Sequence, residues 1–430
     1  MPAKYEQQTS KSKEFHYRAR KVLPAGVSYF IRFFEPYPFY VNWAQGSKLK
    51  DVDGNEYTDF WMGHYTHILG HSPQNVIAAV SEQIQHGTHY GVSHELEVML
   101  AEKIVTMVPC ADMVRFCNSG TESSMYAVRL ARSFTGKNGI VKFEGGWHGG
   151  YDPLHKAVKP PFEMSASSGL VDEALKDTII VPYNDLNGVI RKTDDHEIAA
   201  ILIEPVLGAG GCIPANREFL KGLREFCDDR QILLIFDEII TGFRLAPGGG
   251  QEYYGVIPDI AIFGKILGGG FPIGAVTGKR EIMERMDPML FERPSFSFQG
   301  GTFTGNPTSL VAGLEVLKSL EDGQIIHDLN RRGERLRKDL QEVFSSSTID
   351  VNVTNAGSLF CTHFTAEPVN DVHAVFRADR RRLLDYHLKL IEKGIFFLPT
   401  HSGALSTVHS EEELQHLLVE SEKYVKSLKS

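Results

Sequence analysis

Short apolar runs alternate with amphipathic stretches of helical length from about residue 110 onward. The runs cover residues 113–117, 139–143, 179–181, 199–203, 232–236 and 260–263. Strands that alternate with helices predict βαβ units and a mainly parallel sheet. Because the runs are almost continuously apolar, we expect helices on both faces of that sheet. The pattern therefore predicts an α/β fold.

Both ends of the chain follow a different pattern, which predicts a second, smaller domain. Polar helical spacing over residues 5–22 is followed by a turn-rich stretch, residues 38–60, that is typical of a small antiparallel sheet. Further helices are expected at residues 73–86, 94–108, 307–320, 325–344, 376–393 and 411–428, and further strands near 358–363 and 395–398. We expect residues 71–310 to form a large domain. Residues 1–70, as an N-terminal segment, and residues 311–430 are expected to form a small α+β domain together.

Composition narrows the choice of partners and compartment. The 430 residues carry a formal net charge of −9 without a basic run, so a nucleic acid partner is not expected. The five cysteines are scattered without a CxxC spacing, which predicts reduced thiols in a cytoplasmic protein and no metal site. Residues 1–20 are polar, and no run of about 18 apolar residues occurs, so neither a signal peptide nor a membrane span is expected.

Glycine and charged residues gather directly after the predicted strands. The segments are residues 118–122, 144–150, 204–205, 237–238 and 264–265, each after one of the apolar runs. Ligands of open α/β sheets bind at the carboxyl ends of the strands. The sequence therefore predicts one active site at this edge of the sheet.

Three of these features have both a functional and a structural interpretation. The small residues after Asn118 suit a phosphate at a helix N-terminus, but they also suit an ordinary N-cap. Trp147 could stack on a planar ligand or pack on the core. Asp237 ends an apolar strand and needs a partner, either a protonated ring nitrogen or an arginine such as Arg244.

Lys265 is the most informative of the candidate residues. A lysine that directly follows a buried strand can lose hydration, which lowers its pKa and makes it a nucleophile toward an aldehyde. The structural alternative is a side chain that extends to solvent. One aldehyde cofactor with a phosphate, a ring and a ring nitrogen would use all four features together.

These motifs resemble those of the class III aminotransferases, which are pyridoxal-phosphate (PLP) enzymes of fold type I. The resemblance covers nearly the whole chain and is strongest with the glutamate-1-semialdehyde aminomutases and the β-amino-acid transaminases. It is carried by Asp51-Val52-Asp53-Gly54, Asn118-Ser119-Gly120-Thr121-Glu122, Trp147-His148-Gly149-Gly150, Ile203-Glu204-Pro205-Val206, residues 236–244, Phe263-Gly264-Lys265 and residues 301–307. The resemblance implies the PLP-dependent transferase fold and an enzyme that moves amino groups.

The resemblance also implies roles for individual residues. Lys265 would hold PLP as a Schiff base, the internal aldimine, and would move the proton between substrate and cofactor. Asp237 would keep the pyridine nitrogen protonated. The other cofactor contacts would come from Ser119, Gly120, Thr121, Trp147, His148, Glu204, Ile239 and Thr302. Because Thr302 would reach the phosphate of a partner subunit, a homodimer with shared sites is implied.

The substrate region departs from the aminomutase pattern. Arg32 is kept as a carboxylate anchor in an aromatic stretch that includes Tyr29, while His64 and Tyr65 stand where the aminomutases carry a different segment. The loop over residues 156–169 is shorter than the gating loop of the aminomutases. These departures favour a transaminase that acts on an apolar, aromatic or β-amino acid and a keto acid.

Three other activities are weighed against the transaminase. Glutamate-1-semialdehyde 2,1-aminomutase is the alternative, and an amino-acid racemase on the same scaffold is a further one. A nucleotide-binding enzyme is suggested only by Gly268-Gly269-Gly270, which belongs to neither a P-loop nor a dinucleotide-binding motif.

Overall fold

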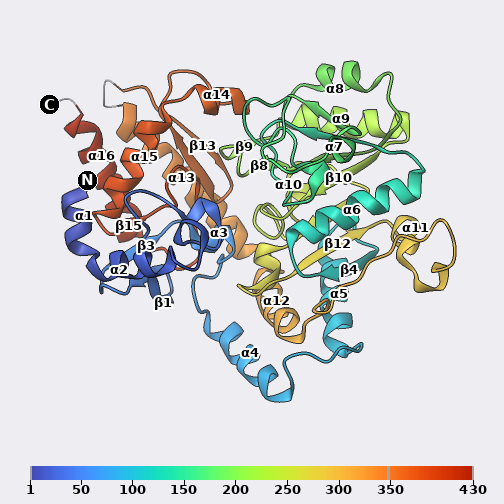
Figure 1. Ribbon diagram of the computed structural model, residues 1–430, viewed down its shortest axis with the longest axis horizontal. Coiled ribbons are helices and arrows are strands. Elements are labelled where there is room, and N and C mark those ends of the chain that lie inside the picture. Colours follow the sequence, from blue (N-terminus) through green and yellow to red (C-terminus); the bar gives the residue numbers. More distant parts are fainter. Residues whose placement is uncertain (1, 346–348, 429–430) are drawn as a thin grey trace. The chain divides into compact units, whose positions relative to one another are not determined.

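The chain divides into two compact units in the computed structural model, which describes residues 2–345 and 349–428 (Figure 1). The first unit comprises the described residues up to 73, those from 331 to 369 and those from 376 onward, and the second comprises residues 74–330 and 370–375. The division at residue 330 falls within α13 (Gln324–Ser345), later than the expected boundary after residue 310. The reason is that α12 (Pro307–Leu320) packs against α4 (Gln74–His86) and α5 (Glu95–Met107).

A seven-stranded sheet forms the centre of the second unit. Its order is β4-β12-β11-β10-β7-β5-β6; β12 runs antiparallel to β11 and β4, and the remaining pairs are parallel. The strands are β4 (Met113–Cys117), β5 (Gly139–Phe143), β6 (Thr178–Val181), β7 (Ile198–Ile203), β10 (Leu233–Asp237), β11 (Ile260–Phe263) and β12 (Gly274–Gly278). The helices α6 (Gly120–Thr135) and α9 (Arg217–Arg230) pack on it. The expected α/β fold with a mainly parallel sheet is confirmed.

The strand β12 is missing from the sequence-based expectation. Its residues, Gly-Ala-Val-Thr-Gly, include few of the β-branched and aromatic side chains that mark a strand. A Cβ at Gly274 would lie 2.4 Å from the carbonyl oxygen of Ser119. The small residues therefore let this strand pass close to the start of α6, a requirement that only the assembled sheet reveals.

The first unit contains two small sheets. In one, the antiparallel strands β1 (Val41–Gln45), β2 (Lys48–Asp51) and β3 (Glu56–Asp59) are extended by β15 (Ile395–Phe396), which is parallel to β3. The other holds the antiparallel strands β13 (Asn352–Ala356), β14 (Leu359–His363) and β16 (Gly403–Ala404). Because β15 pairs with β3, the two ends of the chain join in one unit.

The helix expected over residues 5–22 is broken at Thr9 into α1 (Pro2–Gln8) and α2 (Ser10–Ala19). The Thr9 hydroxyl donates to the Tyr5 carbonyl at 2.6 Å. The Asp53 carboxylate accepts from the backbone N–H groups of Lys11 and Ser12 at 2.6 and 2.9 Å. A carboxylate at a helix N-terminus stabilises it, so the second helix begins where a distant turn caps it.

Shorter elements connect these parts. They are α3 (Met62–Tyr65), α7 (Asp172–Leu175), α8 (Leu186–Thr193), β8 (Val206–Leu207), β9 (Ile213–Pro214), α10 (Gly250–Tyr254), α11 (Arg280–Met283) and α14 (Val372–Arg377), with α15 (Arg380–Ile391) and α16 (Glu411–Ser427) near the end. The helix expected over residues 376–393 is therefore divided between α14 and α15.

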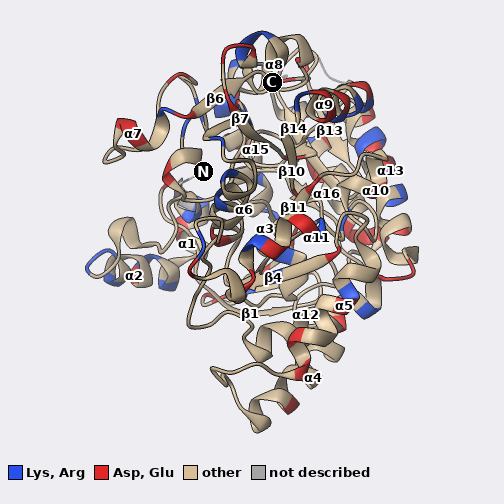
Figure 2. Cartoon of the chain, turned by 90° about the vertical axis from the view of Figure 1, so that its right-hand side faces the viewer, with Lys and Arg blue, Asp and Glu red and all other residues tan. Residues whose placement is uncertain are grey.

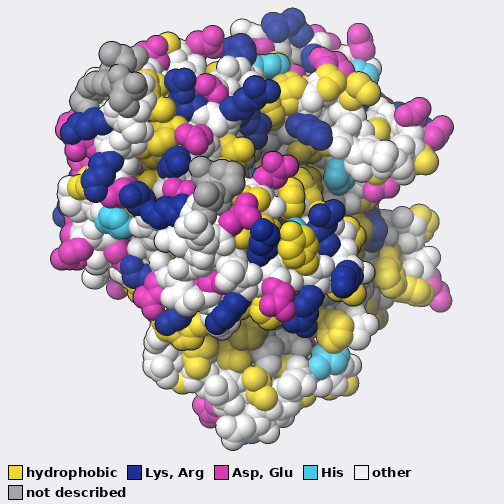
Figure 3. Space-filling view, turned by 60° about the vertical axis from the view of Figure 1, so that its left-hand side comes forward, with side chains coloured by type: hydrophobic (Ala, Val, Ile, Leu, Met, Phe, Trp, Pro, Cys, Tyr) yellow, Lys and Arg dark blue, Asp and Glu magenta, His cyan; other side chains and the backbone are white. Residues whose placement is uncertain are grey.

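Charges of both signs are mixed over the molecule. α9 carries acidic and basic residues alike (Figure 2), and Figure 3 shows the two kinds of charge interspersed with apolar side chains. Within residues 2–345 and 349–428, no helix is long and apolar enough to cross a bilayer. The same residues contain no cluster of three or more His, Cys, Asp or Glu side chains that could hold a metal ion.

Candidate active site

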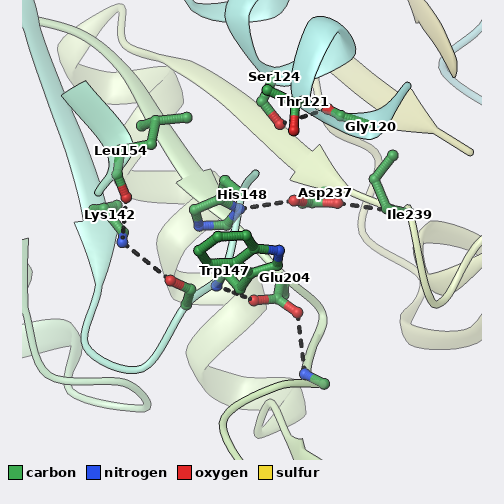
Figure 4. A network of polar contacts seen from close by, with 12 residues as sticks. Gly120, Thr121, Ser124, Lys142, Trp147, His148, Leu154, Glu204, Asp237 and Ile239 are labelled. Atoms are coloured by element: carbon green, nitrogen blue, oxygen red, sulfur yellow. Dashed lines mark hydrogen bonds and ion pairs between the residues drawn. The ribbon is translucent and has the colours of Figure 1, made fainter. Parts of the chain in front are cut away.

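Three adjacent strands of the second unit end at ionisable side chains. Because β7, β10 and β11 are neighbours and run in the same direction, their carboxyl ends meet at one edge of the sheet. Glu204 follows β7, Asp237 ends β10, and Lys265 comes two residues after β11. β5, the other neighbour of β7, leads into a loop over residues 144–156 that carries Trp147 and His148. Figure 4 shows how Glu204 and Asp237 are contacted from this loop.

Asp237 is buried and hydrogen-bonded on both oxygens. Its Oδ2 lies 2.7 Å from Nδ1 of His148, and its Oδ1 accepts from the backbone N–H of Ile239 at 3.0 Å. The sequence left a ring nitrogen and Arg244 as partners of this carboxylate, and the structure adds His148. Burial lowers the pKa of His148, while the Asp237 carboxylate opposes that shift.

Glu204 is held by two backbone donors. Its Oε1 accepts from the N–H of Trp147 at 2.9 Å, and its Oε2 accepts from the N–H of Gly208 at 3.0 Å. Burial, together with the nearby Asp237 carboxylate, raises the pKa of Glu204 to about 8. A carboxyl group of this kind can hold or release a proton near neutral pH.

Lys265 occupies an unusual backbone conformation. Its φ is +47°, in the left-handed region that residues other than glycine rarely adopt. Burial lowers the pKa of Lys265 to about 8, and the carboxylates of Asp237 and Glu204 oppose that shift. A lysine with such a pKa is partly neutral near physiological pH and can act as a nucleophile.

The N-terminus of α6 is capped by a side chain and still has backbone N–H groups that an anion could reach. The Ser119 hydroxyl caps the helix by accepting from the N–H of Glu122 at 3.2 Å, and the Thr121 hydroxyl accepts from the N–H of Gly150 at 3.1 Å. A Cβ at Gly120 would lie 3.0 Å from Cδ1 of Ile239. Because the first N–H groups of a helix lack intrahelical partners, this end can still bind an anion.

Three further residues predicted to contact the cofactor, Trp147, Ile239 and Thr302, differ in their burial and in their neighbours. The Trp147 ring stands edge-on to His155, with centroids 5.6 Å apart. Ile239 is half-buried beside Gly120. Thr302 is exposed, and its role at the phosphate of a partner subunit stays a prediction.

The predicted substrate residues all belong to the first unit. Tyr29 stacks on His64, with ring centroids 5.5 Å apart and an interplanar angle of 17°. Tyr65 is buried with its ring edge-on to Trp61. Arg32 and His64 line a cavity of about 430 Å³ whose other walls are mainly apolar.

The turn that presents His64 was not expected from the sequence. Met62, Gly63, His64 and Tyr65 have φ values of 47°, 58°, 61° and 67° in succession. A run of left-handed residues is strained, since each costs about 1–2 kcal/mol when it carries a Cβ. Such strain is concentrated at functional sites.

Lys142 is a further residue that the sequence-based prediction missed. It lies inside β5, is fully buried and makes polar contacts with the loop after that strand. A signal was present, because Lys142 is the only charged residue in the apolar run 139–143.

Known proteins resemble this chain in sequence and in fold. The sequence model of the family Aminotransferase class-III matches residues 32–421. A glutamate-1-semialdehyde 2,1-aminomutase from Methanothermobacter thermautotrophicus is 43% identical over 98% of this chain and 100% of its own length. An omega-transaminase from Sphaerobacter thermophilus has a TM-score of 0.94 at 34% identity, covering 100% of both chains. A transaminase with PLP bound has a TM-score of 0.90 at 32% identity, covering 98% of each.

Proposed function

Because this chain belongs to the class III aminotransferase family, it is a PLP-dependent enzyme, and we propose that Lys265 bonds the cofactor and transfers the proton during catalysis. One observation carries the proposal: Lys265, Asp237 and Glu204 meet at the ends of three adjacent strands. A nucleophile with a lowered pKa beside two carboxyl groups is the arrangement expected of an active site.

The residues at this edge of the sheet fit the cofactor. The start of α6 offers backbone donors to a phosphate, and the missing side chain of Gly120 keeps the approach open. Asp237 retains acceptor capacity for a ring nitrogen, because a carboxylate has about four lone-pair sites and two are used here. Trp147 and Ile239 are proposed to cover the two ring faces.

Four side chains are proposed to bind, position or transfer protons during the reaction. When bound, PLP supplies a protonated ring that withdraws electrons from the substrate carbon that bears the amino group. Asp237 would hold the proton on the ring nitrogen, and His148 would keep the Asp237 carboxylate in place. Lys265 Nζ would accept the proton that leaves the substrate Cα. Glu204 would hold a further proton nearby.

For the substrate, we propose glutamate-1-semialdehyde and the 2,1-aminomutase reaction, in place of the transaminase that the sequence pattern favours. The support is 43% identity to an aminomutase across that relative's whole length. An aminomutase moves the amino group within one molecule and needs no second substrate. The comparisons support this alternative better than the first expectation.

A transaminase is the second candidate because of the cavity in the first unit. Arg32 can bind a carboxylate, and the apolar walls, which include Phe34, Phe39 and Leu398, suit an aliphatic or aromatic side chain. The 34% identity to an omega-transaminase is further support. The donor would then be an apolar, aromatic or β-amino acid, with a keto acid as acceptor.

We also propose a homodimer in the cytoplasm. Phe298 and Phe303, on either side of Thr302, are 58% and 60% exposed, and exposed apolar side chains of this kind suit an interface. All five cysteines are buried thiols outside any disulfide, which is typical of proteins in a reducing compartment.

The deciding experiment assays the PLP-loaded protein with glutamate-1-semialdehyde alone and with α-, β- and ω-amino donors plus pyruvate or 2-oxoglutarate. We expect conversion of the semialdehyde to its amino ketone isomer without a keto acid. Amino transfer to a keto acid without isomerisation would establish the second candidate instead. Racemisation of a single enantiomer without a keto acid would contradict both, and the Lys265→Ala variant serves as the inactive control.

A further inference from the structure

Lys142 is a charged residue in the middle of a buried strand. All five residues of β5 are buried, and Lys142 itself has no exposed surface. Taking an ammonium group out of water is costly unless the group is hydrogen-bonded. None of the steps assigned to Lys265, Asp237 and Glu204 uses this side chain, so its presence needs another explanation.

The Lys142 ammonium group is enclosed by carbonyl oxygens of the loop that follows its own strand. Nζ donates to the carbonyls of Gly146 at 3.0 Å, Leu154 at 2.9 Å and Lys156 at 2.6 Å. Figure 4 shows the contact with Leu154. Burial lowers the pKa of Lys142 to about 7, although the Glu204 carboxylate opposes this. In the protonated form the ammonium group has three N–H donors, and the three carbonyls use them all. Lys142 therefore ties the beginning and the end of the loop 144–156 to β5.

The loop has little regular structure to hold it in place. Its only helical segment is a 3-10 turn, Asp152–Leu154. Irregular segments with few backbone bonds of their own open more readily than strands or helices. The loop backbone provides a bond between its two ends, from the N–H of Gly145 to the carbonyl of Ala157 at 2.8 Å. The hydrogen bonds from Lys142 add three further fastenings, which reach deeper into the loop.

The same loop sets two groups against the active-site carboxyls. The N–H of Trp147 donates to Glu204, and the ring of His148 contacts Asp237. Both residues lie between Gly146 and Leu154, which are held by Lys142. A shift of the loop backbone would therefore disturb both carboxyl groups together.

We propose that Lys142 is a positioning residue, whose ammonium group holds the loop 144–156 so that Trp147 and His148 meet Glu204 and Asp237. The proposal rests on the proposed function, since it assigns these four residues to the PLP site. Lys142 itself touches neither substrate nor cofactor in this scheme.

The first test is hydrogen–deuterium exchange of the holoenzyme, followed in peptides that cover residues 144–156. In the wild type these amides should be protected far more than the largely exposed residues 163–171. Lys142→Met keeps an unbranched side chain, one atom shorter, but removes all three donors, and exchange in the loop should become at least about tenfold faster. Lys192→Met is the matched control, because Lys192 also donates to a carbonyl, that of Ile180 at 2.9 Å, from an exposed position.

The second test measures the PLP dissociation constant and the pH midpoint of the visible absorption band. Lys142→Met should weaken PLP binding about tenfold. The midpoint should move to higher pH, because loss of a nearby positive charge raises the pKa of neighbouring groups such as His148. Lys142→Gln retains two N–H donors, so its loop exchange and PLP affinity should lie between those of the wild type and Lys142→Met. Its midpoint should move as in Lys142→Met, because both variants lack the positive charge. A purely structural role would change stability without this graded loss of PLP affinity across the two variants.

Two results would overturn the proposal. One is a Lys142→Met variant with wild-type loop exchange and wild-type PLP affinity. The other concerns the wild type alone and applies even if the variants do not fold: loop amides that exchange as fast as residues 163–171 would show that Lys142 does not hold the loop. A wild-type protein that fails to bind PLP would instead contradict the proposed function, while the exchange data would still decide the role of Lys142.

Discussion

Lys265 has a strained backbone conformation and a lowered side-chain pKa. Its left-handed φ of +47° costs on the order of 1 kcal/mol or more, which the surrounding structure must offset. Burial lowers the pKa of Lys265 to about 8, although the carboxylates of Asp237 and Glu204 oppose this. A lysine in water has a pKa of about 10.4. At neutral pH the Lys265 amine is therefore far more often neutral than an ordinary lysine.

The pH dependence of cofactor attachment should reveal this lowered pKa. Only the neutral amine attacks an aldehyde, and the neutral fraction grows as the pH rises through the pKa. The rate at which PLP-free protein bonds PLP should therefore increase with pH up to about 8 and level off above it. The visible absorption band of the product provides the measurement.

Two controls accompany that rate profile. Nα-acetyllysine, treated in the same way, should react at a rate that still climbs near pH 10, because its pKa is about 10.4. Lys265→Ala should form no bond that borohydride can trap. A protein midpoint near 10 would show an unperturbed lysine, and trapped cofactor on another lysine would move the assignment.

At the scale of elements, strand register places the ionisable groups and a close contact joins the helix to the loop. Phe236 is paired with Ile203 and Asp237 with Ile262, so the ends of the three strands are level. Gly149 of the loop passes close to the start of α6, where its Cβ would lie 2.3 Å from Oγ1 of Thr121. Here a glycine is required both by space and by its φ of +83°.

Replacement of Gly149 by alanine should therefore damage the cofactor site. The left-handed backbone costs about 1–2 kcal/mol with a Cβ, and overpacking against Thr121 adds about 1–3 kcal/mol. We expect a lower melting temperature and PLP binding weakened about tenfold, since the contact from Gly150 to Thr121 is lost as well. Fluorescence titration with PLP measures the affinity.

Gly136→Ala is the matched control for this substitution. Gly136 ends α6 with a φ of +71°, but no atom lies within 4 Å of its Cβ position. This variant should lose stability through backbone strain alone and keep its affinity for PLP. Equal PLP affinities in the two variants would refute the role given to the close contact.

At the scale of the whole molecule, the two units contribute different kinds of residue. The second unit contains every residue proposed to hold PLP, whereas the first contains Arg32 and the other residues proposed for the substrate. The second unit also exposes several phenylalanines near Thr302, which include Phe291 at 63%. The side chains of Tyr126 and Arg129 on α6 donate to the carbonyls of Gly300 and Phe298 and so anchor this segment.

The proposed dimer should depend on these phenylalanines. We expect the wild type to sediment with twice the chain mass of 48.0 kDa. Phe303→Glu should raise the dissociation constant of the dimer at least about tenfold, because burial of one such side chain contributes about 1.5–3 kcal/mol. Val22→Glu, at a position 79% exposed in the first unit, is the control and should sediment like the wild type. A wild type that remains monomeric at all concentrations would refute the proposal.

Elements that depend on a local residue pattern were predicted from the sequence, whereas elements that depend on distant contacts were not. The apolar runs that became β7, β10 and β11 were recognised because each is a local pattern, and the PLP-type cofactor followed from the residues at their ends. The strand β12 was missed because its small residues are needed for close packing against Ser119, a contact that the local sequence does not contain. The helix break at Thr9 was missed because Asp53 creates it from a distance.

The sequence by itself determined the α/β fold, the aminotransferase family and the cofactor, because these depend on residue periodicity and on motifs that are contiguous in the chain. Only the tertiary structure decided which side chains meet: Asp237 with His148, Glu204 with the Trp147 amide, and Lys142 with the carbonyls of its own loop. The lowered pKa of Lys265 likewise arises only when the strands assemble. Contacts and burial join residues that lie far apart in the chain, and no local pattern contains them.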